Sequence, residues 1–351
     1  MTSQDLGMRY LCRGILTHPL GLHCNVPTDP LRPDGPGSIN QFFKGLRRAV
    51  ERGATFIDTS DSYGLGHSER LIGRFLRAYP DLSAHLSSKV GRVRGSAEHP
   101  YAGRHIHHQL EQSLENLYAE QLDLYTLDTF DFGPGDRYLG NAIDVMRTLR
   151  EVESIKAIGM RGPVTSYGAS PEERQEQAER FMYLFRLIKP DVVWSPFNAF
   201  TPAIELEGED LFTFAARHGV GLVLAAPLAH GMPAGDTASQ PTSRAPFTSK
   251  RAGLSHPVAE RLDQSLQVLR DTFGHEPGTL THLALRSTLQ RGDQCVVVVD
   301  FANEQQIEED YSCLGPPLTP SELRIIDDVY TSLRAYVHQA APRLLVKELQ
   351  A

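Results

Sequence analysis

The 351-residue sequence has few cysteines and no long apolar run, and these absences exclude several classes of protein. Its four cysteines, Cys12, Cys24, Cys295 and Cys313, form no CxxC pair, which favours a reducing, cytoplasmic location. No apolar stretch approaches 18 residues, so no transmembrane helix is expected. Residues 1–5 are polar and lack the basic-then-apolar pattern of a signal peptide.

Positive charge is also scarce relative to negative charge. Lys and Arg number 35 against 43 Asp and Glu, and no run of basic residues stands out. The net charge of −8 gives an acidic surface that repels phosphate backbones and anionic lipids. We therefore expect neither nucleic acid nor a membrane as a partner, and the composition does not indicate an oligomeric state. The sequence also has no P-loop and no Ser-His-Asp motif.

Short apolar strands alternate with helices along the chain. Ser38-Ile39-Asn40-Gln41 is typical of a capping box that opens a helix, and Ser170-Pro171-Glu172-Glu173 has the same pattern with Pro at the first helical position. The expected helices are 38–51, 67–79, 103–118, 139–151, 170–188, 208–218, 257–273, 278–290 and about 319–338. The expected strands are one near 11–24, then 54–58, 84–88, 122–127, 154–159, 191–194, 220–225 and 295–299.

Eight strand–helix units predict an α/β fold with a parallel sheet closed into a (β/α)₈ TIM barrel. An open, doubly wound sheet is the alternative, but it usually carries a Gly-rich phosphate turn after an early strand, and no GxGxxG is present. We expect residues 1–351 to form one barrel domain. The irregular stretch of about 226–256 follows a strand, which predicts a long loop over the top of the barrel.

Polar residues follow three neighbouring strands of the predicted barrel. Asp58 and Tyr63 follow the second strand, Lys89 follows the third and Asp128 follows the fourth. Active sites of such barrels lie at the C-terminal ends of the strands, so these four side chains are predicted to cluster there. A Tyr beside a Lys and an Asp suits a proton donor, since the ammonium is expected to lower the pKa of the phenol and the carboxylate to orient the ammonium.

The segment around these residues resembles the signature of the aldo-keto reductase family. The matching residues are Gly53-Ala54-Thr55-Phe56-Ile57-Asp58-Thr59-Ser60-Asp61-Ser62-Tyr63-Gly64, then Ser68-Glu69 and Gly73. Further matches are residues 112–117, 122–125, Ile158-Gly159, Phe197-Asn198 and Pro227-Leu228 with Gly231. The resemblance implies NAD(P)H-dependent reduction of a carbonyl in a small-molecule substrate, such as one of specialised metabolism, by an Asp-Tyr-Lys-His tetrad. By position, the first three members are Asp58, Tyr63 and Lys89.

The fourth member of the family's tetrad is a His at the end of strand four, and this chain has Asp128 there. A His donates a hydrogen bond to the substrate carbonyl, whereas an ionised Asp only accepts and opposes a developing oxyanion. Three interpretations of Asp128 stay open: it is protonated, it binds another substrate group, or it acts as a base.

The residues at the family's cofactor positions differ as well. By position, the expected cofactor contacts are Arg161 and Trp194 at the nicotinamide, and Pro227, Leu228, Gly231, Asp300 and Asn303 along the rest of an NADPH molecule. In the family a Ser-Asn pair stands at Arg161-Gly162, a Gln at Trp194, a Glu-Asn pair at Glu309-Asp310 and, by a looser alignment, Gly-Thr at His23-Cys24. Asp300 and Asp310 would repel a phosphate.

Three functions follow from these observations. The first is an NADPH-dependent carbonyl reductase with Tyr63 as the proton donor. The second is a cofactor-independent proton-transfer enzyme, catalysing an elimination, isomerisation or cyclisation with Tyr63, Lys89 and Asp128. The third is a non-catalytic binding or regulatory module on the same fold.

The remaining histidines and Cys24 suggest no further site. His67 and His230 are expected on top-face loops near the substrate. His105, His107 and His108 are expected on a solvated helix behind the barrel, and no metal site is predicted. Cys24 is expected to be a buried structural thiol.

Overall fold

Eight parallel strands form a closed barrel in the computed structural model, which describes residues 6–26, 38–165, 169–198, 201–228 and 256–340. Around the barrel the order of the strands is β10-β3-β4-β5-β6-β7-β8-β9. The predicted TIM barrel is therefore confirmed. The strands are β3 (Leu20–His23), β4 (Phe56–Asp58), β5 (His85–Val90), β6 (Leu122–Leu127), β7 (Ile155–Arg161), β8 (Val192–Pro196), β9 (Gly221–Ala225) and β10 (Cys295–Asp300).

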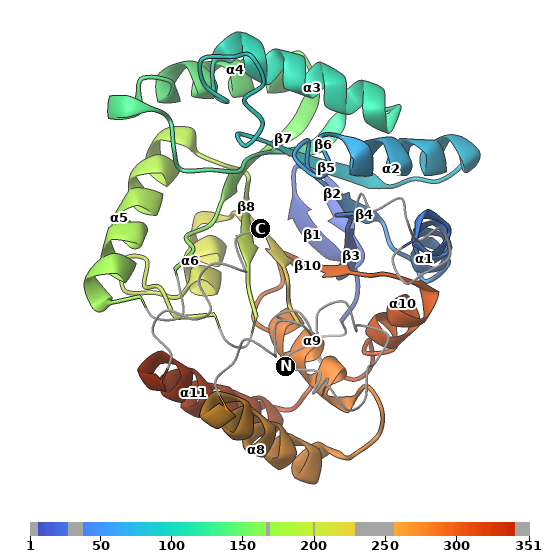
Figure 1. Cartoon of the computed structure of the whole chain (residues 1–351), viewed down its shortest axis with the longest axis vertical. Coiled ribbons are helices and arrows are strands. Elements are labelled where there is room, and N and C mark those ends of the chain that lie inside the picture. Colours follow the sequence, from blue (N-terminus) through green and yellow to red (C-terminus); the bar gives the residue numbers. More distant parts are fainter. Residues whose placement is uncertain (1–5, 27–37, 166–168, 199–200, 229–255, 341–351) are drawn as a thin grey trace.

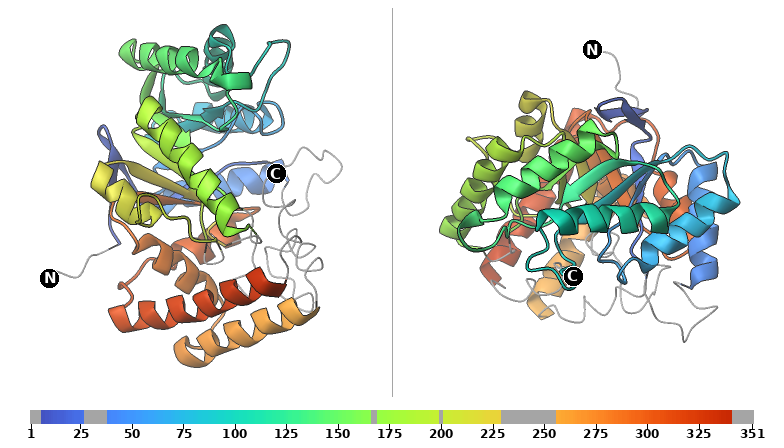
Figure 2. Two further views of the ribbon diagram at one scale, coloured as in Figure 1. Left: turned by 90° about the vertical axis from the view of Figure 1, so that its left-hand side faces the viewer. Right: turned by 90° about the horizontal axis from the view of Figure 1, so that it is seen from above.

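Helices surround the barrel, as Figure 1 shows from one end. The predicted capping box at Ser170 is present, with reciprocal hydrogen bonds between Ser170 and Glu173. Helices α8 and α11 pack against each other outside α9, and both views of Figure 2 show them side by side. The helices are α1 (Ile39–Glu51), α2 (His67–Ala78), α3 (Gly103–Leu117), α4 (Leu139–Glu151), α5 (Pro171–Ile188), α6 (Leu211–His218), α8 (His256–Phe273), α9 (Thr279–Leu289), α10 (Glu304–Tyr311) and α11 (Pro320–Ala340), with a 3-10 turn at Pro134–Asp136.

The segment before β3 differs from the prediction of one strand near 11–24. It forms an antiparallel hairpin of β1 (Arg9–Cys12) and β2 (Ile15–Thr17), and only then the barrel strand β3. The chain reverses at Arg13 and Gly14, whose φ angles are 39° and 75°. A Cβ on Gly221, at the start of β9, would lie 2.5 Å from the carbonyl oxygen of Leu11. The hairpin therefore closes the N-terminal end of the barrel and leaves the opposite end for a site.

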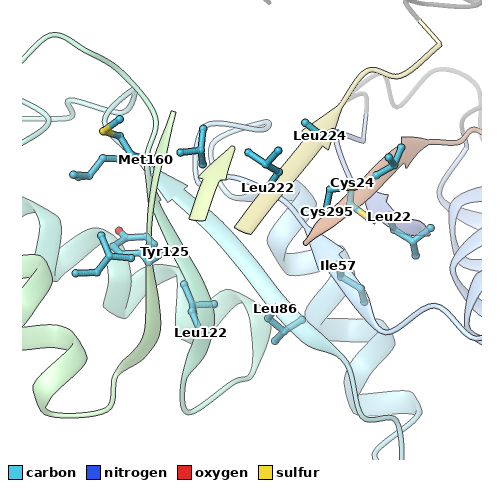
Figure 3. Packing of buried hydrophobic residues seen from close by; sticks show 14 of the residues in the cluster. Leu22, Cys24, Ile57, Leu86, Leu122, Tyr125, Met160, Leu222, Leu224 and Cys295 are labelled. Carbon is cyan, nitrogen blue, oxygen red and sulfur yellow. The ribbon is translucent and has the colours of Figure 1, made fainter. Parts of the chain in front are cut away.

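Alternate residues of each strand face the helices or the barrel interior. Figure 3 shows outward-facing side chains of the larger apolar cluster, among them Leu22, Ile57, Leu86 and Leu222. A second cluster fills the interior with the hairpin. It consists of Leu11, Cys12, Ile15, Phe56, Leu124, Ala157, Val192, Trp194, Val223, Ala225, Val296 and Val298.

The same alternation places polar residues at the C-terminal mouth. Counting two residues on from inward-facing Phe56, Val298 and Val192 gives Asp58, Asp300 and Trp194. Counting four residues on from Leu124 and Ala157 gives Asp128 and Arg161, which face the same way. The ladder sets His23 beside Asp58 on one side and Asp300 on the other. None of the helices described is long and apolar enough to cross a bilayer.

Candidate active site

Asp58 lies at the centre of the mouth and is completely buried. Its Oδ2 accepts hydrogen bonds from Lys89 Nζ at 2.7 Å, His23 Nδ1 at 2.9 Å and Trp194 Nε1 at 3.0 Å. Its Oδ1 accepts from Ser87 Oγ at 2.7 Å. Burial alone would raise the pKa of Asp58, but Lys89 and His23 outweigh it and lower the pKa to about 2. Asp58 is therefore an ionised carboxylate at neutral pH.

Lys89 points into the barrel from β5 and is also completely buried. Its ammonium is held by Asp58 and by the backbone oxygen of Thr59, at 2.6 Å. It also lies 4.8 Å from the Trp194 ring and 5.5 Å from the Tyr63 ring, so two aromatic faces cover the charge. These contacts fix Lys89 behind Asp58 rather than at the surface of the mouth.

Tyr63 lies beside this pair, in the loop between β4 and α2, and is partly exposed. Its ring meets the edge of His23 at a centroid distance of 5.3 Å. Burial and then the charges of Asp58, Asp128 and Asp300 raise the pKa of Tyr63 well above its ordinary value, against the opposing effect of Arg161. The expectation that the Lys89 ammonium lowers this pKa is therefore wrong, because that ammonium is hydrogen-bonded to Asp58. Tyr63 stays a neutral phenol, able to donate its hydrogen.

Asp128 follows β6 and is paired with two arginines. Arg161 Nη1 donates to its Oδ1 at 2.8 Å, and Arg92 Nε donates to its Oδ2. The carboxylate is 3% exposed. Of the interpretations considered for Asp128, a protonated acid and a free base both fit poorly with two guanidinium partners. The arrangement is an ion-pair cluster of net charge +1 on one side of the mouth.

Two large side chains occupy the positions expected to hold the nicotinamide. Trp194, at the position where the family has a Gln, reaches from β8 across the mouth to Asp58 and is 5% exposed. His23, which a loose alignment places where the family has a Gly, meets Trp194 from β3 with ring centroids 6.2 Å apart. Arg161 lies 5.3 Å from the Trp194 ring and is committed to Asp128. The polar groups of Trp194 and Arg161, which were expected to contact the nicotinamide carboxamide, are therefore hydrogen-bonded to Asp58 and Asp128 instead.

The segment expected near the adenosine phosphate is strongly acidic. Residues 300–310 include Asp300, Glu304, Glu308, Glu309 and Asp310, with no Lys or Arg. A helix N-terminus can bind a phosphate through free backbone N–H groups. At α10, however, the Asn303 side chain accepts from Gln306 N at 3.0 Å, the Gln306 side chain accepts from Ala302 N at 2.6 Å, and Glu304 occupies the first turn.

The α1 arginines that face this segment are already paired. Arg48 donates to Glu308, and Arg52 lies 3.9 Å from the same carboxylate. A carboxylate about 4 Å from a phosphate charge opposes binding by about 1 kcal/mol in water. Trp194, His23 and this acidic segment therefore differ from the residues expected to bind a nicotinamide dinucleotide, and their side chains do not fit one.

The other predicted contacts are less informative. Pro227 and Leu228 follow β9 and are buried, with Leu228 packed in the outer core. Gly231 and His230 lie outside the described residues, as does most of the predicted loop 226–256. Cys24 is buried as expected. Among the residues described, no group of three His, Cys, Asp or Glu side chains could hold a metal ion.

Sequence reasoning missed two residues that the structure brings to the site. His23 was noted only through a loose alignment with a Gly of the family. The alternation of Leu20 and Leu22 with Gly21 and His23 would have predicted that its side chain lies inside the barrel. Arg92, two residues beyond β5, gave no signal, because its pairing with Asp128 depends on how the two loops lie together.

Comparisons with known proteins give a family and a fold. A family model described as the aldo/keto reductase family matches residues 34–331. L-Galactose dehydrogenase of Arabidopsis thaliana is 23% identical over 286 residues, which cover 80% of each protein. Probable aldo-keto reductase 1 of Glycine max is 24% identical over 330 residues, which cover 90% of this chain and 86% of the relative.

Two solved structures illustrate the likeness of fold. Glycerol dehydrogenase from Gluconobacter oxydans superposes with a TM-score of 0.69 and 20% identity, and all of both chains is covered. An aldo-keto reductase from Klebsiella pneumoniae in complex with NADPH gives a TM-score of 0.62 and 18% identity, over 93% of this chain and 96% of that one.

Proposed function

This chain belongs to the aldo/keto reductase family, and from its site we propose that it is an enzyme that moves protons on a carbonyl-bearing small molecule without a nucleotide. The family typically reduces carbonyls with NAD(P)H. The observation that carries the proposal is that Trp194 and His23, at positions expected to contact the nicotinamide, are both hydrogen-bonded to Asp58. The acidic segment 300–310 supports it independently.

Tyr63 is the group that faces the substrate carbonyl in this proposal. Because its pKa is raised, the phenol keeps its hydrogen and donates it to the carbonyl oxygen. That hydrogen bond strengthens as the oxygen gains negative charge, so it stabilises an enolate more than the starting ketone. The buried Lys89–Asp58 pair positions Tyr63, because the Lys89 ammonium is hydrogen-bonded to Asp58 and lies 5.5 Å from the Tyr63 ring.

The reaction is a proton transfer with no change in the substrate's overall oxidation state. A base removes a proton from the carbon next to the carbonyl, and the C–H electron pair becomes the enolate under Tyr63. The proton then returns at another carbon in an isomerisation, or a group leaves the next carbon with its electron pair in an elimination. Attack of the enolate carbon on a second carbonyl carbon of the same molecule, whose oxygen takes the displaced electron pair and the proton, would give a cyclisation.

The cluster of Arg92, Asp128 and Arg161 orients the substrate in this proposal. Its net charge of +1 favours a substrate with a carboxylate, enolate or other electron-rich oxygen on that side. Asp128 holds the two guanidinium groups in place, since both of its oxygens are occupied. Which substrate is accepted is determined by loops outside this cluster.

NAD(P)H-dependent reduction of a small-molecule carbonyl, with Tyr63 as the proton donor, is the second candidate. The buried Asp58–Lys89 pair at 2.7 Å beside Tyr63 favours it, as these three residues match the tetrad of the family. A structural relative was crystallised with NADPH. No observation at the site favours a purely non-catalytic module.

Deuterium incorporation separates the two candidates. Pyruvate, hydroxyacetone and 2-oxobutyrate are incubated with the protein in D₂O without nucleotide, and loss of the α-proton signals is followed by NMR. We expect faster exchange than in buffer, and a fall of about 100-fold or more in Tyr63→Phe. Oxidation of NADPH by these carbonyls, with no exchange in its absence, would refute the proposal and support the reductase.

A further inference from the structure

The proposed reaction needs a base, and the described mouth offers four ionisable candidates besides His23. Lys89 is buried and carries its proton in the pair with Asp58. Asp128 has both oxygens on guanidinium groups. Tyr63 has a raised pKa and keeps its proton. Asp300 is 40% exposed and lies 4.0 Å from His23 Nε2, so it is a solvated neighbour of His23 at the rim of the mouth.

His23 has the geometry that the others lack. Its Nδ1 lies 2.9 Å from Asp58 Oδ2, and its side chain is 10% exposed. Asp58 is ionised and has no hydrogen to give, so the hydrogen in this bond belongs to Nδ1. When this ring is neutral, its lone pair is therefore on Nε2. A carboxylate that fixes the tautomer of a His in this way is the arrangement by which enzymes prepare a general base.

The surroundings of the ring suit the charged product as well. Nε2 lies 4.0 Å from Asp300 Oδ1, so an imidazolium formed at His23 would lie between two carboxylates. Lys89 opposes this charge, because its ammonium donates to the same Asp58 Oδ2 as His23 Nδ1. Tyr63 meets the same ring edge-on at 5.3 Å, so the proton donor and the basic nitrogen flank one small region.

We propose that His23 is the general base of this site, with Nε2 taking a proton from the carbon next to the carbonyl whose oxygen Tyr63 binds. The inference rests on the proposed function. The α-carbon–hydrogen bond breaks, its electron pair becomes the enolate, and the proton forms the imidazolium between Asp58 and Asp300. The same proton, or one from water, then returns to carbon.

The first test uses the exchange of pyruvate, hydroxyacetone and 2-oxobutyrate α-protons in D₂O with His23→Gln, whose side chain keeps a similar size. General acid–base catalysis contributes about 100- to 10,000-fold, so exchange should fall by that factor while the melting temperature stays near wild type. His107→Gln is the matched control, as His107 is exposed on α3 behind the barrel. Free imidazole should restore part of the exchange in His23→Gly, which a structural role would not produce.

The second test needs no substrate. Long-range ¹H–¹⁵N NMR identifies which imidazole nitrogen carries hydrogen, and His23→Gln assigns the signal. We expect the Nδ1-protonated tautomer at neutral pH in the wild type, and its loss in Asp58→Asn. A hydrogen on Nε2 would overturn the assignment of His23 whatever the exchange shows. Exchange that persists in His23→Gln would overturn it too, while leaving proton transfer itself intact. Absence of exchange with tight NADPH binding would overturn the proposed function instead.

Discussion

Asp61 provides a prediction in which replacing a charged residue makes the protein more stable. It lies two residues before Tyr63 and is 6% exposed. Burial, followed by the nearby charge of Glu69 and a smaller effect of Asp128, raises the pKa of Asp61 from 3.8 to about 7 despite a hydrogen bond from Ser60. Gln109 donates a further hydrogen bond at 3.2 Å. Asp61→Asn keeps the shape of the neutral acid and removes its titration.

The direction in which stability changes with pH follows from proton binding to Asp61. The folded state holds the Asp61 proton more tightly than the unfolded state, so the stabilisation is complete below about pH 4 and is lost as the pH rises through 7. A difference of about 3 pKa units, at about 1.4 kcal/mol per unit, sets an upper limit near 4 kcal/mol. Asp61→Asn should therefore exceed wild type in unfolding free energy above pH 8 by up to that amount, and by much less near pH 4.

Urea unfolding of both proteins across this pH range measures the difference, in which the titration of all other groups cancels. Asp81→Asn, at an exposed carboxylate, is the control and should show no such trend. A wild type that is more stable than Asp61→Asn above pH 8, or a difference that does not depend on pH, would refute the reasoning about Asp61.

Three further predictions concern the mouth of the barrel. Tyr63→Phe should lower turnover by about 100-fold or more and change the melting temperature little, which activity assays and thermal unfolding check. Asp58→Asn leaves the Lys89 ammonium buried without its carboxylate, so urea unfolding should show a loss of about 3–5 kcal/mol; a loss below about 1 kcal/mol would contradict the pairing. Asp128→His should be as damaging to turnover as Asp128→Asn and Asp128→Ala, because each removes the partner of Arg92 and Arg161; an active Asp128→His would favour the reductase.

The barrel could be predicted from the sequence because its signals are local. Helix caps, apolar runs and their alternation fix each unit within a few residues, as at Ser170 and along Cys295–Asp300. The N-terminal hairpin was missed since its turn depends on positive φ angles at Arg13 and Gly14 within an otherwise strand-like run. The hairpin closes the N-terminal end of the barrel through a contact between Leu11 and Gly221, which is more than 200 positions away in the sequence.

The sequence could predict which residues gather at the candidate site, but not which of them form hydrogen bonds and ion pairs with one another. Asp58, Tyr63, Lys89 and Asp128 follow adjacent strands, so topology alone brings them together. Which base pairs with which acid depends on the register of the barrel and on side-chain reach across it. Trp194 crosses from β8 to Asp58 on β4, and Arg92 reaches Asp128 from a loop, so neither partner is a neighbour in sequence.

Titration with NADPH tests the central claim most directly, and the chain contains its own probe. Trp194 is its only tryptophan and lies where the nicotinamide would have to enter. NADPH absorbs at the wavelengths of tryptophan emission, so its binding would quench Trp194 by energy transfer, with free tryptophan amide as the control for light absorption. We predict no saturable quenching up to about 1 mM NADPH, which corresponds to a binding free energy weaker than about −4 kcal/mol. Saturable quenching with a micromolar Kd would show that the mouth accepts the dinucleotide and would contradict the account.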